Sequence, residues 1–130
     1  MSGKIEYVLD SAAVIALLSL ESGYQRVAEL LDKSAISSVN LAEIFNKLVQ
    51  KSSAEEVREL LRPLELQVED WSEDMAYRSV EFTQFNKSHG LSLGDRACLT
   101  LAKQLRATAV TSDRTWRRLP SLGVRIMIFR

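Results

Sequence analysis

Residues 8–18 read VLDSAAVIALL, a short apolar run that ends at Asp10 and passes directly into a second, helix-forming apolar run. The first run predicts a buried strand and the second a buried helix, with Asp10 at the turn between them. In an open α/β sheet, the turn at the carboxyl end of a strand is where ligands and catalytic groups lie. A carboxylate is costly to bury there alone, so the position predicts that a positive group meets Asp10.

Strand-forming and helix-forming segments alternate along the whole chain. Strands are expected at 5–9, 35–38, 64–68, 109–111 and 124–129, and helices at 11–18, 24–31, 41–49, 54–62, 72–88 and 92–106. This alternation predicts an α/β protein with a parallel sheet covered on both faces. The strand at 64–68 alternates apolar and polar residues, which is typical of a sheet edge. With no linker or repeat in 130 residues, we expect a single domain over 1–130.

Composition excludes several classes of function. The chain has 17 Lys and Arg against 17 Asp and Glu, so its formal net charge is zero and any attraction to nucleic acid must be local. One histidine and one cysteine exclude a multi-histidine zinc site and a disulfide framework. No apolar run reaches the roughly 20 residues of a membrane span, and no signal peptide is visible. We therefore expect a cytoplasmic protein without a membrane partner.

Charge is distributed unevenly along the chain. Residues 54–74 hold eight acidic side chains against two arginines, whereas residues 103–130 hold seven basic side chains against one acid. Such runs are either solvated faces or, for the basic quarter, a surface that contacts a phosphate backbone. The candidate phosphate-binding residues adjoin acidic positions in the sequence: Arg96, Arg114, Arg117 and Arg118.

Four carboxylates occupy turn or helix-start positions: Asp10, Glu43, Asp95 and Asp113. Asp10 and Asp113 end strands, and Glu43 is expected in the first turn of the helix after the second strand. Asp95 starts the helix that leads into the strand ending at Asp113. In a doubly wound sheet, these positions belong to the carboxyl edge of the strands or lie within reach of it.

Each of these acids also has a purely structural interpretation. Glu43 would close a capping box with Asn40, Asp95 would do so with Ser92, and Asp113 would stabilise a turn through its own backbone. Caps, however, do not need to converge on one point of a sheet. Carboxylates that converge raise one another's pKa, which a divalent cation relieves. Oxygen ligands without histidine or cysteine favour Mg²⁺ or Mn²⁺, which activate water against a phosphodiester bond.

Four blocks of the sequence carry a resemblance to a known family: VLDSAAVIALL, SSVNLAEIFNKL, LSLGDRACLTLAKQL and AVTSDRTW. In this order they resemble PIN domains and, more narrowly, the VapC toxins of bacterial and archaeal toxin–antitoxin pairs. The resemblance covers nearly the whole chain and implies a three-layer α/β/α fold with a mostly parallel central sheet. It also implies an Mg²⁺- or Mn²⁺-dependent endoribonuclease that forms homodimers and is inhibited by a cognate VapB-like antitoxin.

The resemblance also assigns roles to residues. Asp10, Asp95 and Asp113 would hold the metal, and Glu43 would add a ligand or position the attacking water. The family's polar helpers correspond to Ser11, Asn40, Thr111 and Ser112. Candidates for an apolar groove that receives the antitoxin are Leu17, Leu18, Leu20, Trp71 and Met75.

Three alternatives remain open. Dehalogenase-type phosphotransfer enzymes also place an aspartate after their first strand, but they need a second one two residues on, where this chain has Ala12. A response-regulator receiver needs a phosphoacceptor after its third strand, and residues 64–68 followed by Glu69-Asp70 match that poorly. The third alternative is a non-catalytic interaction module in which the acids act only as caps.

Overall fold

The computed structural model describes residues 4–85, 90–119 and 123–130. At its centre is a five-stranded sheet of order β3-β2-β1-β4-β5, in which every neighbouring pair of strands is parallel. The strands are β1 (Tyr7–Leu9), β2 (Ser34–Ser37), β3 (Gln67–Glu69), β4 (Thr108–Thr111) and β5 (Ile126–Ile128). The predicted parallel sheet is confirmed, and β3 lies at its edge as expected.

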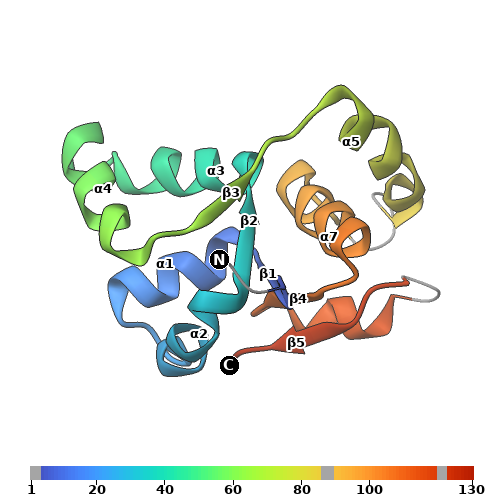
Figure 1. The fold of residues 1–130 in the computed structure, drawn as a ribbon, viewed down its shortest axis with the longest axis horizontal. Coiled ribbons are helices and arrows are strands. Elements are labelled where there is room, and N and C mark those ends of the chain that lie inside the picture. Colours follow the sequence, from blue (N-terminus) through green and yellow to red (C-terminus); the bar gives the residue numbers. More distant parts are fainter. Residues whose placement is uncertain (1–3, 86–89, 120–122) are drawn as a thin grey trace.

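Helices cover both faces of this sheet. The α-helices are α1 (Ser11–Ser19), α2 (Tyr24–Leu30), α3 (Ser38–Leu48), α4 (Ala54–Leu61), α5 (Glu73–Arg78) and α7 (Leu93–Leu105). The 3-10 helices are η1 (Leu31–Lys33), η2 (Arg62–Leu64), η3 (Ser79–Phe85) and η4 (Arg114–Arg118). Figure 1 shows α1 to α4 on one side of the strands and α5 and α7 on the other, which confirms the three-layer α/β/α fold. None of the helices in the described part of the chain is long and apolar enough to cross a membrane.

Two hydrophobic cores form because successive strand residues point to opposite faces of the sheet. Val8 and Ala109 pack with α7 and Trp116 in one core. Their neighbours Leu9 and Val110 pack with side chains of α1, α2, α3 and α4 in the other core. A central strand with both faces buried must be apolar throughout, which explains why the run before Asp10 contains no polar residue.

The order of the strands creates a switch point at the carboxyl end of β1. From β1 the chain moves outward through β2 to β3, and it then crosses back to place β4 on the other side of β1. Ligands bind in α/β sheets where the winding direction reverses in this way. The residues that follow β1 and β4 therefore lie beside the position where this fold offers a crevice.

Three expected boundaries were wrong for local reasons. The helix expected over 72–88 begins as predicted, with Ser72 capping Met75, but α5 ends at Arg78 and continues as η3. Within this stretch, the hydroxyls of Ser79 and Thr83 donate to carbonyl oxygens three residues back, which favours the tighter 3-10 turn. The expected end near Ser88, and His89, lie outside the described residues.

The strand expected at 64–68 starts only at Gln67. Pro63 lies in η2, which also includes Leu64, and Glu65 then adopts a left-handed backbone with φ of 47°.

The helix expected around 41–49 begins earlier than predicted, at Ser38, because Ser37 at the end of β2 caps it directly. Glu43 therefore lies in the second turn of α3 and not in the first.

Candidate active site

Asp10 lies at the turn between β1 and α1 and is only 6% exposed. Its Oδ1 accepts a hydrogen bond from the backbone N–H of Ala13 at 2.9 Å, so the carboxylate caps α1. The hydroxyl of Thr111, at the end of β4, also hydrogen-bonds this carboxylate. None of the ion pairs formed within the described residues includes Asp10, so the cationic partner expected from the sequence does not come from these side chains.

Burial raises the pKa of Asp10 from 3.8 to about 6. The hydrogen bonds from Thr111 and Ala13 lower this pKa, while the negative charges of Asp95 and Glu43 raise it further. The three acids are therefore close enough to interact. A buried carboxylate in this position is energetically costly as an anion and would gain from a positive charge beside it.

Thr111 connects Asp10 to the turn that carries Asp113. The Oγ1 of buried Thr111 accepts a hydrogen bond from the backbone N–H of Asp113 at 3.0 Å. Asp113 in turn caps η4, because its Oδ1 accepts hydrogen bonds from the backbone N–H and hydroxyl of Thr115 at 2.9 and 2.6 Å. The predicted turn role of Asp113 is thus confirmed, and the same turn directs it to the switch point.

Asp95 lies in the first turn of α7. It forms the predicted capping box with Ser92: the Asp95 N–H donates to Ser92 Oγ at 3.1 Å, and the Ser92 N–H donates to Asp95 Oδ2 at 2.9 Å. Burial raises the pKa of Asp95, the bonds with Ser92 oppose this, and the charges of Asp113 and Glu43 raise the pKa further. Asp95 therefore interacts with acids from both neighbouring elements.

Glu43 is held by Asn40, one turn earlier on α3. The Asn40 Nδ2 donates to Glu43 Oε1 at 2.9 Å and to the carbonyl oxygen of Gly94 at 3.1 Å. The capping box predicted for Asn40 and Glu43 is wrong, because α3 is capped by Ser37 and Asn40 lies inside the helix. Asn40 instead positions Glu43 and joins α3 to α7. Its Oδ1 is buried and has no hydrogen-bond partner among the residues that the structure describes.

The four acids therefore come from four elements and meet at one edge of the sheet. The negative charges of Asp95 and Glu43 raise the pKa of Asp10, and those of Asp113 and Glu43 raise the pKa of Asp95. Within residues 4–85, 90–119 and 123–130, however, no three carboxylate, imidazole or thiol groups are drawn together closely enough to enclose a metal ion.

The remaining predicted residues differ in their exposure to solvent. Ser11 and Ser112 are half-buried next to Asp10 and Asp113 in the chain. Arg96 is half-buried and donates to the carbonyl oxygen of Leu91 at 3.0 Å. The other three arginines are exposed at the surface; they are Arg114, whose guanidinium reaches the Arg130 carbonyl at 3.2 Å, Arg117 and Arg118.

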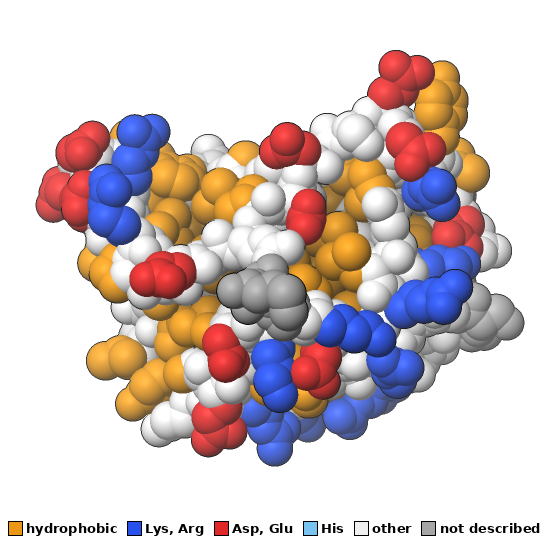
Figure 2. Space-filling view, viewed as in Figure 1, with side chains coloured by type: hydrophobic (Ala, Val, Ile, Leu, Met, Phe, Trp, Pro, Cys, Tyr) orange, Lys and Arg blue, Asp and Glu red, His pale blue; other side chains and the backbone are white. Residues whose placement is uncertain are grey.

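Basic side chains also gather on the surface of the molecule. Figure 2 shows Lys and Arg side chains gathered at the lower centre and lower right of this face, while Asp and Glu lie at its upper corners and are also scattered over its middle and lower part. The gathering of basic side chains agrees with the excess of Lys and Arg in residues 103–130.

Gly94 is the site residue that sequence reasoning missed. A Cβ at this position would overlap the carboxylate of Glu43, so only glycine leaves room for that side chain. The available signal was a glycine in the first turn of an otherwise strong helix, where it lowers helix stability and therefore indicates a packing or functional reason.

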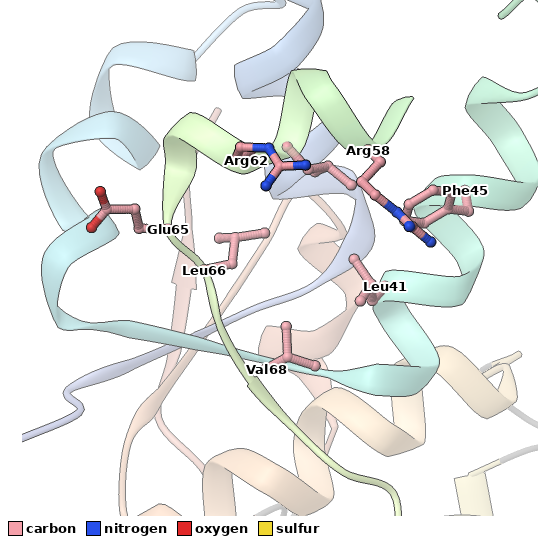
Figure 3. A pocket seen from close by; sticks show the side chains of 8 residues that line it. Leu41, Phe45, Arg58, Arg62, Glu65, Leu66 and Val68 are labelled. Carbon is pink, nitrogen blue, oxygen red and sulfur yellow. The ribbon is translucent and has the colours of Figure 1, made fainter. Parts of the chain in front are cut away.

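An apolar groove lies between α3, α4 and the segment that leads into β3. It has a volume of about 420 Å³ and is lined by Leu41, Phe45, Arg58, Leu61, Arg62, Glu65, Leu66 and Val68. Figure 3 shows apolar side chains from α3 and from this segment facing a common space beside Arg58 and Arg62. None of the five residues expected to form a groove lines it. Met75, only 5% exposed, belongs to the core.

A family model of the PIN domain matches residues 7–122. At the level of sequence, comparison with curated proteins gave no match. Among solved structures, the chain is similar to VapBC2 from Rickettsia felis bound to a DNA fragment from their promoter. The TM-score is 0.72 at 23% identity, and the match covers 93% of this chain and 96% of that one.

Two further solved structures give the same result. DNA-bound VapBC from Salmonella typhimurium gives a TM-score of 0.75 at 17% identity, with 97% of this chain and 99% of that chain covered. A toxin–antitoxin complex from Klebsiella pneumoniae gives 0.74 at 22% identity, with 96% and 98% covered. At these identities the similarity shows a shared fold. Because the family model spans most of the sequence, this chain belongs to the PIN-domain family.

Proposed function

We propose that this protein is a metal-dependent endoribonuclease and acts as the VapC-type toxin of a toxin–antitoxin pair. PIN domains are generally nucleases, and the chain belongs to that family. The observation that carries the proposal is the meeting of four carboxylates at the switch point of the sheet, with the pKa of buried Asp10 raised to about 6. Caps alone would not require these acids to influence one another.

The set of donor groups fits Mg²⁺ or Mn²⁺. All four acids supply oxygen, the ligand atom that hard cations prefer. Asp10, Asp95 and Asp113 would hold the ion, directly or through water, and Glu43 would add a ligand or position the attacking water. When bound, such an ion supplies an activated water and stabilises charge on the phosphodiester.

The chain's own residues prepare this site by fixing the carboxylates. Thr111 and the start of α1 hold the Asp10 carboxylate, and the backbone N–H of Ser92 holds the Asp95 carboxylate. Asn40 fixes Glu43, and for each of these acids at least one hydrogen bond determines where the carboxylate points. Ser11 and Ser112 lie next to the acids in the chain and would orient bound water. Water, and not the ribose 2′-hydroxyl, would then attack, which leaves a 5′-phosphate on the product.

RNA would reach this edge along the basic side chains of the C-terminal quarter. The exposed Arg117 and Arg118 follow Asp113 on η4, and Arg114 begins that helix. Guanidinium groups bind phosphates in a planar, two-pronged manner, so these three residues and Arg96 are the proposed phosphate contacts. Trp116 is buried in the core and is not available for stacking on a base.

We also propose a VapB-like antitoxin as the protein partner and a homodimer as the working form. The similar structures from three bacteria are VapBC or toxin–antitoxin complexes, and this chain shares their fold. The groove between α3 and α4 supplies an apolar surface with two arginines at its border. It suits an antitoxin segment that presents apolar and acidic side chains.

The proposal is tested with purified protein and a structured RNA in Mg²⁺ or Mn²⁺. Asp10→Asn and Asp95→Asn should each reduce cleavage to background while circular dichroism shows a folded protein. Asp32→Asn, an exposed acid on η1, is the matched control and should cleave like the wild type. Mapped product ends should carry 5′-phosphates, and EDTA should stop the reaction.

Cleavage that continues in excess EDTA, or in both aspartate variants, would contradict the metal-dependent mechanism. Calorimetry separates the main alternative, because a non-catalytic module whose acids serve only as caps would bind no Mn²⁺. In that case RNA would remain intact with the wild type as well.

A further inference from the structure

Helices α3 and α7 are in contact where Glu43 lies against Gly94. Gly94 is buried and is the second residue of α7. A Cβ built on it would overlap the carboxyl carbon and both carboxylate oxygens of Glu43. Its φ is not among the positive values found in the described chain, so glycine is not needed there for its backbone conformation. What the position needs is the absence of a side chain.

The same contact is fixed by a buried amide. Asn40 is 1% exposed, and its Nδ2 donates both to Glu43 Oε1 and to the carbonyl oxygen of Gly94. One amide group therefore holds the carboxylate of α3 and the backbone of α7 together. This arrangement places the Glu43 carboxylate in the volume that a side chain at position 94 would occupy.

We propose that Gly94 is a positioning residue for the acidic cluster: it leaves open the space in which the Glu43 carboxylate stands beside Asp95. A methyl group at position 94 would push this carboxylate away and weaken divalent-cation binding. The inference rests on the proposed function for its cation, but the contact between Gly94 and Glu43 is tested independently of any activity.

We expect Gly94→Ala to affect the stability of the fold differently from the affinity for the cation. A carboxylate is the far end of a flexible side chain, so Glu43 would move and the two helices would stay in place. Alanine also favours a helix over glycine, by up to about fivefold in the unfolding equilibrium constant. Gly94→Ala should therefore not unfold the protein, although it disturbs the site. A merely structural glycine would show the opposite pattern.

The experiment compares the wild type, Gly94→Ala, Glu43→Ala and the double variant. Mn²⁺ affinity is measured by calorimetry, and unfolding by urea in EDTA. Gly94→Ala should lower Mn²⁺ affinity by about tenfold, as expected when a group that orients a ligand is lost, and by a similar factor to Glu43→Ala. The double variant should show no further loss. Asn46→Ala, at an exposed position on α3, is the matched control and should retain wild-type affinity.

The free energies of unfolding should also show that positions 94 and 43 depend on each other. Gly94→Ala should stabilise the Glu43→Ala background more than it stabilises the wild type, because only the wild type has a carboxylate to displace. Equal effects in both backgrounds, wild-type Mn²⁺ affinity in Gly94→Ala, or a further loss in the double variant would each overturn the inference. If the wild type binds no Mn²⁺, the proposed function and the role toward the cation both fail. The unfolding comparison would still show whether Glu43 occupies this space.

Discussion

Asp10 performs two tasks whose energetic effects oppose each other. Its Oδ1 caps α1 through Ala13, which stabilises the helix by about 1 kcal/mol. Its burial raises the pKa to about 6, so the ionised group at neutral pH costs about 3 kcal/mol relative to an unfolded chain with a pKa of 3.8. This cost remains although the hydrogen bond from Ala13 already lowers the pKa of Asp10. A neutral capping residue would therefore serve the fold better, which indicates that the charge is kept for another purpose.

Asp10→Asn should increase the stability of the metal-free protein at pH 7 by about 1–3 kcal/mol. Because the pKa of Asp10 is raised in the folded state, its protonated form stabilises the fold below about pH 4, and this contribution is lost as pH rises to about 6. The asparagine variant should lack that part of the pH dependence. Urea unfolding in EDTA between pH 4 and 7.5 measures both effects, with Asp32→Asn as the control.

An unchanged pH profile in Asp10→Asn, or a loss of stability at pH 7, would show that the buried carboxylate is not costly. Addition of Mn²⁺ gives an independent check. It should stabilise the wild type and leave Asp10→Asn almost unaffected, because a ligand stabilises only the folded form that binds it.

At the scale of elements, two capping boxes among the described residues differ in their surroundings. Ser53 and Glu56 cap α4 at an exposed end, away from the acidic cluster. Ser92 and Asp95 cap α7 inside that cluster. The local hydrogen-bond pattern is the same in both, so the pair separates what a cap does for a helix from what it does for the site.

Ser53→Ala and Ser92→Ala should each lower the free energy of unfolding by about 1 kcal/mol. Only Ser92→Ala should also weaken Mn²⁺ binding, because the Ser92 hydroxyl lowers the pKa of Asp95. Without it, protons compete better for Asp95, so the loss of affinity should be larger at pH 6 than at pH 8. Calorimetry at the two pH values tests this, and an equal loss of affinity in Ser53→Ala would contradict it.

Element types were predictable wherever side-chain periodicity determines them. The apolar runs before Asp10 and Asp113 became the central strands β1 and β4, because both faces of a central strand are covered. The end of α5 was not predictable in this way. There, Ser79 and Thr83 hydrogen-bond to carbonyls of their own turn, and such bonds change the helix type without changing the pattern of apolar residues.

The candidate site was predictable in its acids but not in its supporting contacts. Asp10, Asp95 and Asp113 each stand out at a turn or helix start, and the parallel topology brings such positions to one edge. Glu43 lies one turn further into its helix than the sequence predicts. The roles of Asn40 and Gly94 depend on how α3 packs against α7 across 54 residues of sequence. A contact between two distant helices leaves only an indirect trace in a single sequence, here a glycine inside a helix.

At the scale of the whole molecule, two pairs of arginines should act on different partners. Replacing both Arg117 and Arg118 with Glu should raise KM for RNA several-fold and reduce its salt dependence, because fewer phosphate contacts release fewer counter-ions. Replacing both Arg58 and Arg62, which border the apolar groove, should leave RNA cleavage unchanged and weaken antitoxin binding. Each double variant is the control for the other.

Kinetics at several salt concentrations and a titration with the antitoxin measure these effects. If the Arg58 and Arg62 variant loses RNA cleavage, the two surfaces are not separate. If the Arg117 and Arg118 variant keeps the wild-type salt dependence, RNA does not follow the basic quarter of the chain.

The only thiol of the chain, that of Cys98, lies beneath the acidic cluster. Cys98 is fully buried on α7, its Sγ is 3.8 Å from the carbonyl oxygen of Val8 in β1, and burial together with the nearby acids raises its pKa well above 9.0. A thiol in this state reacts only when α7 separates from the sheet. The rate at which a thiol reagent labels the native protein therefore reports how often the layer under the acidic cluster opens.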